Sequence, residues 1–79
     1  MATIRLFAGA REAAGTDRDH LDGATVGEVL DAAADRFGPA FVQILGSCKV
    51  WLNGEPAERS DAVGDGDEVA VLPPVSGGT

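Results

Sequence analysis

The chain has 79 residues, which is enough for one domain and too few for two. Its formal net charge is -7, with 13 acidic side chains against 6 Lys and Arg residues scattered along the chain. Nucleic acids and anionic membrane surfaces are bound through Lys and Arg, so this composition argues against both and favours a partner protein with a basic face.

The N-terminal part predicts a strand, a helical turn and a second strand. Residues 3–8 alternate around Ile4, Leu6 and Ala8, which is typical of a strand. Residues 10–14 are rich in Ala and Glu and predict a single helical turn ended by Gly15. Residues 18–21 predict a weaker, exposed second strand.

The clearest element is a helix that begins after Thr25. Thr25 is a good N-cap, and Glu28 stands three residues later as its capping-box partner. Gly38 and Pro39 are expected to end this helix. Apolar residues at spacings of three and four then predict one buried face, made of Val26, Val29, Leu30, Ala33, Ala34 and Phe37.

A hairpin is predicted in the middle of the chain. Residues 40–45 predict a short helical turn or a packed loop, and residues 48–52 a strand. The dipeptide Asn53-Gly54 follows, and it is typical of a type I′ turn because both central residues of that turn need positive φ.

Short strands complete the sheet. Residues 55–57 predict the return strand of the hairpin, kept short or at a sheet edge by Pro56. Residues 61–67 predict a turn-rich loop, and residues 68–72 a final strand. Pro73 and Pro74 end that strand because proline has no backbone N–H to donate.

These elements predict a two-layer α+β fold, a mixed sheet of four to five strands packed on one main helix. The first and last strands are the most apolar, so we expect them side by side at the centre of the sheet. Residues 1–74 are predicted to form the domain and residues 75–79 a flexible C-terminal tail. So small a domain has little room for a deep substrate pocket, and no acid, base and nucleophile converge in the pattern. A carrier or binding role is therefore favoured over an enzyme.

The sequence also indicates where the protein works. The single cysteine, Cys48, excludes an intrachain disulfide. The first residues resemble a strand rather than a signal peptide, and no apolar run approaches the roughly 20 residues that span a bilayer. We expect a cytoplasmic protein.

The C-terminal tail is the main candidate site. Residues 69–79 carry no charged side chain, and Pro73-Pro74 favour an extended direction away from the sheet. Gly77 and Gly78 have no side chains, so their backbone suits a narrow cleft in another protein. The alternative is an ordinary frayed chain end.

Four segments together form a recognisable pattern: residues 3–15 (TIRLFAGAREAAG), 25–30 (TVGEVL), 50–54 (VWLNG) and 65–78 (DGDEVAVLPPVSGG). They resemble the MoaD/ThiS family of ubiquitin-like sulfur carriers, most closely its MoaD-type molybdopterin synthase small subunits, and they cover nearly the whole chain in the family's order. The resemblance implies the β-grasp, or ubiquitin-like, fold.

The resemblance also implies a chemistry for the tail. An E1-like (MoeB/ThiF-like) adenylyltransferase would adenylate the carboxylate of Gly78, and a sulfur donor would convert it to a thiocarboxylate. The sulfur would then pass to an acceptor such as the molybdopterin synthase large subunit. ATP and zinc would belong to the activating partner, and the chain itself would bind no cofactor or metal. Clearance in the partner's cleft is assigned to Gly77 and Ser76, and partner contact to Pro73, Pro74 and Val75.

The chain departs from the family pattern at Thr79. Active carriers of the family end at the second glycine, whereas here Gly78 is followed by Thr79 and so carries an amide in place of a carboxylate. We expect a peptidase to remove Thr79; the alternatives are that Thr79 disables the carrier or is tolerated.

Other functions share this sequence pattern. Thiazole, cysteine and secondary-metabolite pathways use the same carrier chemistry. A ubiquitin-like modifier would join the activated glycine to lysine amines, and a plain β-grasp interaction module would do no chemistry at the tail.

Three other residues have both a structural and a functional interpretation. Cys48 is expected to be structural. Lys49 should point to the opposite face of the strand, so its charge would not lower the pKa of the thiol. His20 has only Asp19 and Asp22 nearby and is expected to be an exposed residue rather than a ligand. Trp51 is either a partner anchor or half-buried in the sheet. The acidic stretch 55–68 is expected to be a solvated loop, with docking on a basic partner as the alternative.

Overall fold

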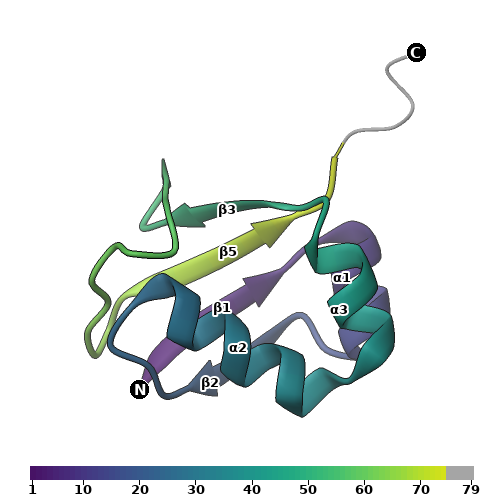
Figure 1. Cartoon of the computed structure of the whole chain (residues 1–79), viewed down its shortest axis with the longest axis horizontal. Helices are drawn as coiled ribbons and strands as arrows, with labels where there is room; N and C mark the ends of the chain where they lie inside the picture. The colour runs from purple at the N-terminus through teal and green to yellow at the C-terminus, as the bar shows by residue number, and fades with distance from the viewer. Residues whose placement is uncertain (75–79) are drawn as a thin grey trace.

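The structure is a computed structural model that describes residues 1–74. Its five strands form one mixed sheet in the order β2-β1-β5-β3-β4 (Figure 1). β1 and β5 run parallel side by side at the centre, and the other pairs are antiparallel. The predicted sheet and its central pair are therefore confirmed. The strands are β1 (Ala2–Leu6), β2 (Arg18–Leu21), β3 (Lys49–Leu52), β4 (Glu55–Pro56) and β5 (Glu68–Leu72).

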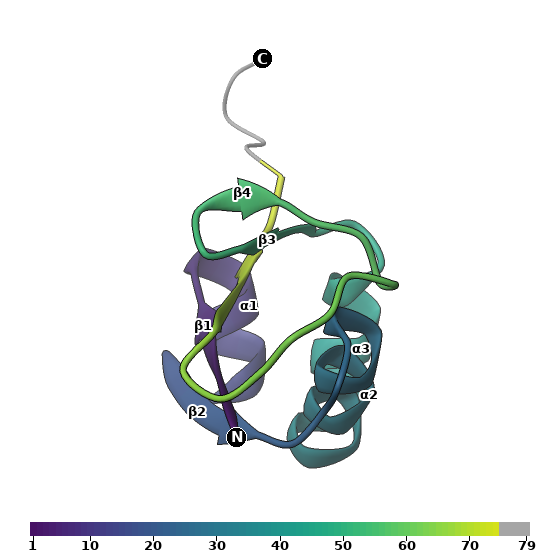
Figure 2. The ribbon, with the colours of Figure 1, turned by 90° about the vertical axis from the view of Figure 1, so that its left-hand side faces the viewer.

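Helix α2 (Val26–Phe37) lies with α3 (Pro39–Leu45) on one side of the sheet (Figure 2). The predicted main helix is α2; the helical turn predicted at residues 10–14 is the short helix α1 (Ala8–Ala14), and residues 40–45 belong to the short helix α3. These two pack on each other, and a Cβ at Gly9 would come within 2.8 Å of the Ile44 Cδ1 atom. The two short helices therefore contribute to the packed fold together with α2.

The start of α2 follows the predicted capping box. The Glu28 backbone N–H donates to Thr25 Oγ1 at 3.1 Å. The Glu28 carboxylate reaches back to the Ala24 N–H at 2.9 Å, one residue before the cap. The first bond satisfies one of the donors that a helix start leaves without an intrahelical partner, and the second holds the residue before the cap; together they fix where the helix begins.

Two local predictions are wrong in an instructive way. Ala8 was expected in the first strand, but it adopts φ 50° and begins α1. Pro39 was expected only to stop the preceding helix; it also begins α3, because its missing N–H costs nothing at a first helical position. Residues 40–45 accordingly form a true helix rather than a loop. Its Phe41 is fully buried and meets Phe37 edge-on at 5.3 Å between ring centroids.

The hairpin matches its prediction closely. Asn53 and Gly54 have φ values of 51° and 86°, as a type I′ turn requires. Cys48 and Ala57 were expected inside strands but flank them, since β3 begins at Lys49 and β4 ends at Pro56. The Ala57 N–H still donates to the Val50 carbonyl oxygen at 3.0 Å.

The core lies between the sheet and α2. Alternate positions of β1 and β5 point into it, so Ile4, Leu6, Val69 and Val71 are almost completely buried. From α2 the buried residues are Val26, Gly27, Val29, Leu30 and Ala33. The predicted apolar face is confirmed, with Ala34 and Phe37 only half-buried. Within residues 1–74, no helix is both long and apolar enough to cross a membrane.

Candidate functional site at the end of β5

The chain leaves the sheet from its centre. Leu72, the last residue of β5, pairs with Lys49 of β3, and on the other side the Phe7 N–H donates to the Val71 carbonyl oxygen at 3.3 Å. Pro73 is half-buried and Pro74 is exposed. Because β5 is held on both sides, whatever follows Pro74 starts from a fixed point on the domain.

The predicted reactive residues follow that point. Val75, Ser76, Gly77, Gly78 and Thr79 lie outside the described residues. Their assigned roles in clearance, sulfur carrying, partner contact and processing remain predictions.

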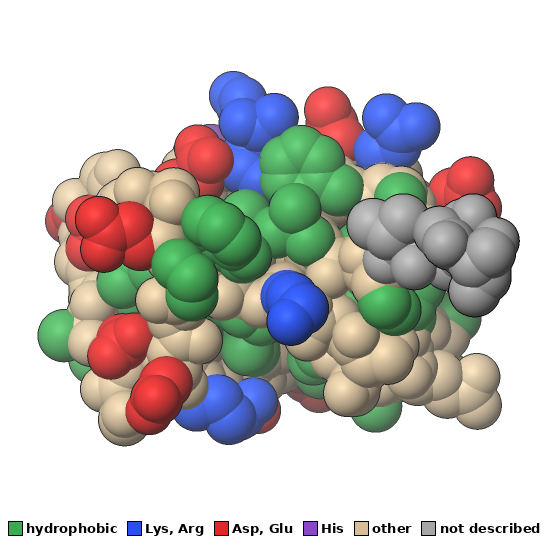
Figure 3. Space-filling view, turned by 90° about the horizontal axis from the view of Figure 1, so that it is seen from above, with side chains coloured by type: hydrophobic (Ala, Val, Ile, Leu, Met, Phe, Trp, Pro, Cys, Tyr) green, Lys and Arg blue, Asp and Glu red, His purple; other side chains and the backbone are tan. Residues whose placement is uncertain are grey.

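The face of the sheet that points away from α2 is called the outer face here. Strand alternation assigns to it Thr3, Arg5, Arg18, His20, Lys49, Trp51, Glu68, Ala70 and Leu72. Phe7 follows β1 and is 37% exposed, and the Arg5 guanidinium carbon lies 5.3 Å from the centre of its ring. Figure 3 looks down on the end of the sheet where β3 lies; there hydrophobic side chains gather over the middle of the molecule, with Lys and Arg side chains among and beside them.

The charge of this outer face differs from that of the whole chain. Among the described strand positions that belong to it, Arg5, Arg18 and Lys49 are cationic and Glu68 alone is anionic. The whole chain has 13 acids against 6 Lys and Arg. A count of charges along the chain does not reveal this segregation, whereas a count over alternate positions of each strand does.

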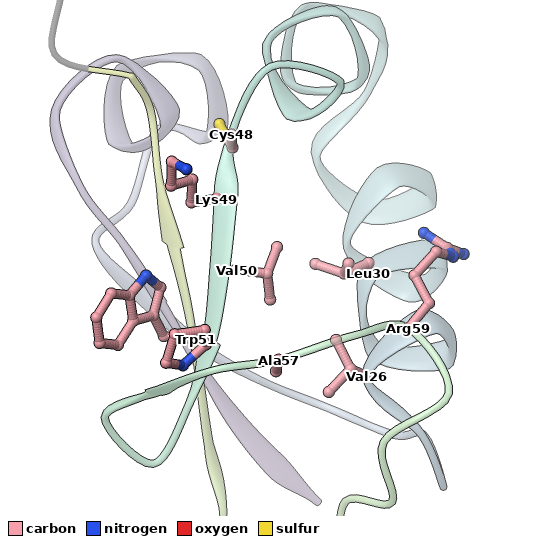
Figure 4. Close-up of a pocket in the computed structure, with 9 residues that line it drawn as sticks. Val26, Leu30, Cys48, Lys49, Val50, Trp51, Ala57 and Arg59 are labelled. Atoms are coloured by element: carbon pink, nitrogen blue, oxygen red, sulfur yellow. The ribbon is translucent and has the colours of Figure 1, made fainter.

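Trp51 is half-buried in the sheet, as one of its two interpretations predicts, and its role as a partner anchor stays a prediction. It pairs across the sheet with Ala70 and at the edge with Pro56. Its ring points away from α2, as does Lys49, whereas Val50 between them points toward Leu30 (Figure 4). The ring therefore packs on the outer face while part of it stays open to a partner.

Cys48 lies at one end of a groove of about 420 Å³ between β3 and α2. Its Sγ donates to the Ile44 carbonyl oxygen at 3.2 Å, and burial raises the pKa of the thiol. The neighbouring Lys49 side chain points to the other side of β3 (Figure 4). A protonated, hydrogen-bonded thiol is a poor nucleophile, so the structure favours the structural interpretation of Cys48. The groove is lined by Val26, Leu30, Cys48, Lys49, Val50, Trp51, Pro56, Ala57 and Arg59.

His20 is exposed on β2, with its Nδ1 3.3 Å from Thr3 Oγ1. Across residues 1–74, no group of three or more His, Cys, Asp or Glu side chains is placed to hold a metal ion. The geometry of the described part of the chain therefore gives His20 no metal partners.

The acidic stretch 55–68 closes its own turns. Asp61 accepts the Glu58 N–H at 2.8 Å, and Asp67 accepts the Gly64 N–H at 2.8 Å and the Asn53 side-chain amide at 3.1 Å. The two hydrogen bonds that Asp67 accepts lower the pKa of its carboxylate, and the bond from Gly64 lowers it most. Asp61 and Asp67 thus have local structural partners, which favours the solvated-loop interpretation.

Comparison with known proteins places the chain in a protein family. Residues 4–78 match the model of the ThiS family. The chain is 40% identical to small archaeal modifier protein 1 of Haloferax volcanii over 94% of this chain and 97% of that protein. A crystal structure of that protein superposes with a TM-score of 0.82.

Two further relatives support the match. The molybdopterin synthase sulfur carrier subunit of Chlamydomonas reinhardtii is 39% identical over 95% of both chains. A chain in the structure of the Amycolatopsis orientalis BexX/CysO complex is 25% identical, covers 99% of this chain and 100% of its own length, and has a TM-score of 0.83. The predicted β-grasp fold is thereby confirmed.

Proposed function

The chain belongs to the MoaD/ThiS family of ubiquitin-like sulfur carriers, and on that premise we propose that it supplies sulfur to molybdenum cofactor biosynthesis through Gly78. Members of this family are small carrier subunits without catalytic groups of their own. The question for this chain is therefore which atom carries the sulfur and which pathway receives it.

The proposed chemistry takes place at the carboxylate of Gly78. One carboxylate oxygen attacks the α-phosphorus of ATP, forming an acyl adenylate and releasing pyrophosphate. A sulfur nucleophile at the oxidation level of sulfide then attacks the acyl carbon, and AMP leaves with the oxygen. The product is a thiocarboxylate, whose sulfur is later transferred. The carrier's contribution is to present its terminus in register, which is a large source of rate.

The family match carries this proposal. It runs from residue 4 to residue 78 and so includes Gly77 and Gly78 but not Thr79. The structure adds that β5, which leads into this segment, is fixed between β1 and β3. A reactive carbonyl at Gly78 would follow that anchored strand by six residues, from Pro73 to Gly78.

Removal of Thr79 is part of the proposal. While Thr79 is attached, the Gly78 carbonyl belongs to a peptide bond and has no carboxylate oxygen to adenylate. Hydrolysis of that bond by a peptidase would release Thr79 and create the reactive terminus at Gly78.

Two partner enzymes follow from this chemistry. An E1-like adenylyltransferase of the MoeB/ThiF type would supply ATP binding, a zinc site and the sulfur-transfer step. An acceptor of the kind represented by the molybdopterin synthase large subunit would receive the sulfur. Both would act in the cytoplasm. The name of the 39% identical Chlamydomonas relative supports the molybdopterin pathway.

The proposal is tested by intact mass. A chain ending at Gly78 is incubated with the host's E1-like enzyme, ATP and a sulfur source, and the full chain ending at Thr79 is the matched control. We expect the shorter chain to exchange one oxygen for sulfur and the control to remain unchanged. Protein isolated from the host should lack Thr79. Absence of sulfur gain in the Gly78-ending chain would exclude the carrier chemistry.

A second candidate function is a ubiquitin-like modifier. The name of the 40% identical Haloferax relative favours it. Both functions begin with the same acyl adenylate, but a modifier passes the acyl group to a lysine amine and forms an isopeptide bond. Conjugates of higher mass in host extract that disappear when Gly77 and Gly78 are deleted would support the modifier; free thiocarboxylate alone would support the carrier. Thiazole, cysteine or secondary-metabolite pathways would be distinguished by which acceptor consumes the sulfur.

A further inference from the structure

The chain contains two amines that can accept an acyl group. Lys49 is its one lysine, because the other residues in its total of 6 Lys and Arg are arginines. A guanidinium stays protonated in proteins, whereas a lysine amine is a nucleophile that attacks acyl carbons. The second amine is the N-terminal one. An acyl group activated at Gly78 therefore finds only these two amine acceptors on another copy of this chain.

The N-terminal amine is already engaged. The Met1 ammonium donates a hydrogen bond to Asp65 and forms an ion pair with it, and this bond raises the pKa of the amine. A raised pKa removes part of the advantage that an α-amino group ordinarily has over a lysine at neutral pH. Attack by this nitrogen also requires that its contact with Asp65 be broken. Lys49 is left as the amine without such a constraint.

Lys49 is open on the surface of the sheet. It is exposed, and its side chain points away from the groove that Cys48 and Val50 line (Figure 4). Within residues 1–74, no carboxylate forms an ion pair with its ammonium. Its backbone is fixed in β3 by pairing with Leu72 of β5. An incoming acyl group can therefore reach the Lys49 nitrogen without displacing any part of the fold.

The length of the tail favours a lysine on another copy. The six residues from Pro73 to Gly78 span at most about 20 Å. Because Leu72 pairs with Lys49, the chain would have to reverse direction after Pro74 to bring Gly78 back to its own Lys49. Two successive prolines favour an extended course over such a reversal. The Lys49 amine of a second copy requires no reversal.

We propose that Lys49 is the site at which one copy of this chain is joined to the Gly78 acyl group of another copy. This inference rests on the proposed function, because it needs Gly78 activated as the acyl adenylate. The Lys49 nitrogen attacks the acyl carbon and forms an isopeptide bond. AMP leaves with the electrons of the broken carbon–oxygen bond, and the amine proton passes to solvent. Each copy has one Gly78 and one lysine, so the copies join in unbranched chains with a single kind of linkage.

Separate donor and acceptor chains test this inference. The donor is a Lys49→Arg chain ending at Gly78, and the acceptor is the chain ending at Thr79, which keeps Lys49 but has no carboxylate at Gly78. Both are incubated with the host's E1-like enzyme and ATP, without a sulfur source, and intact mass is measured. We expect a donor–acceptor dimer that weighs one water less than the sum of the two chains. Lys49→Arg in the acceptor, the matched control, should lower the dimer yield more than about tenfold, because arginine offers no neutral amine.

Trypsin locates the bond. It cleaves after unmodified Lys and Arg, so acylated Lys49 should leave residues 37–59 as one peptide that carries residues 60–78 of the donor. Circular dichroism checks that the Lys49→Arg chains are folded. A dimer that persists with the Lys49→Arg acceptor, or a branch at the Met1 nitrogen, would overturn the inference. So would a Gly78-ending chain with Lys49 intact that loses one water as a monomer and forms no dimer, because the bond would then lie within one copy.

The remaining outcomes separate the inference from the proposed function. Adenylation of the donor is followed by ATP–pyrophosphate exchange, and sulfur gain by intact mass once a sulfur source is added. Adenylation and sulfur gain without any dimer would leave the carrier function standing and refute the inference. If the donor is not adenylated, its Gly78 is converted chemically to a thioester and offered to the same two acceptors. Joining that requires Lys49 would then support the inference with the proposed function refuted, and no joining, or equal joining to both acceptors, would refute both.

Discussion

Asp67 joins the hairpin to the loop before β5, and its bonds make stability depend on pH. Its carboxylate accepts hydrogen bonds from the Gly64 N–H and the Asn53 side chain, which lower its pKa from the ordinary value of 3.8. A group whose pKa is lower in the folded state stabilises the fold above its unfolded pKa and loses that contribution as the pH falls through its folded pKa. We therefore expect Asp67→Asn to lower Tm at neutral pH but to have little effect at about pH 2.

The measurement is a thermal unfolding series from about pH 7 to about pH 2 on both proteins. Asp35→Asn, at an exposed position on α2, is the matched control and should leave Tm nearly unchanged throughout. If the Tm difference between Asp67→Asn and the natural chain is as large at about pH 2 as at neutral pH, the hydrogen bonds to the ionised carboxylate do not explain that difference. The N-terminal ammonium also lowers the pKa of Asp65. Both proteins contain Asp65, so its contribution to the pH dependence cancels in the comparison.

The contact between the loop before α2 and the first turn of that helix depends on Gly23. A Cβ at Gly23 would lie 2.7 Å from the Val29 backbone nitrogen, a contact that requires the helix or the loop to move. We expect Gly23→Ala to destabilise the protein by roughly 1–3 kcal/mol, the usual cost of overpacking. Gly46→Ala is the control, because Gly46 is in the right-handed helical region and its Cβ would meet nothing closer than 3.9 Å. Urea unfolding should show that control unchanged or slightly stabilised; equal losses in the two variants would contradict a steric origin.

The elements that the sequence predicts best are those whose ends carry their own hydrogen bonds. The capping residues Thr25 and Glu28 fixed the start of α2, and Asn53-Gly54 fixed the hairpin. The predictions failed where one residue serves two elements: Ala8 continues the strand pattern and yet begins α1, and Pro39 both follows one helix and begins the next. The packing of α1 on α3 brings together residues far apart in the chain, which no local pattern records.

Only part of the candidate site could be predicted from the sequence. The family resemblance is the basis of the role proposed for Gly78, and the apolar composition of residues 68–72 correctly predicted a strand at the centre of the sheet. The cationic outer face was not anticipated, because Arg5, Arg18 and Lys49 are far apart in sequence and only the strand register brings them to one surface. Net charge, a property of the whole chain, pointed the other way.

At the scale of the molecule, folding and the proposed chemistry are assigned to different parts of the chain. Every buried hydrophobic residue of the described core lies between Ala2 and Val71, and the proposed reactive carboxylate belongs to Gly78. A change confined to residues 75–79 should therefore affect transfer without affecting folding. The ion pair between the N-terminal ammonium and Asp65 lies at the start of β1, and a change in residues 75–79 should not alter it.

A chain ending at Pro74 tests this division directly. We expect its Tm and urea midpoint to match those of the chain ending at Gly78, because every residue of the described core is retained. It should accept no AMP or sulfur. A Gly78→Ala variant of the Gly78-ending chain is the control at full tail length: it should fold equally well and be adenylated more slowly, because a Cβ at that position would enter the narrow cleft proposed for the activating enzyme. Loss of folding in the Pro74-ending chain would show that the tail belongs to the domain.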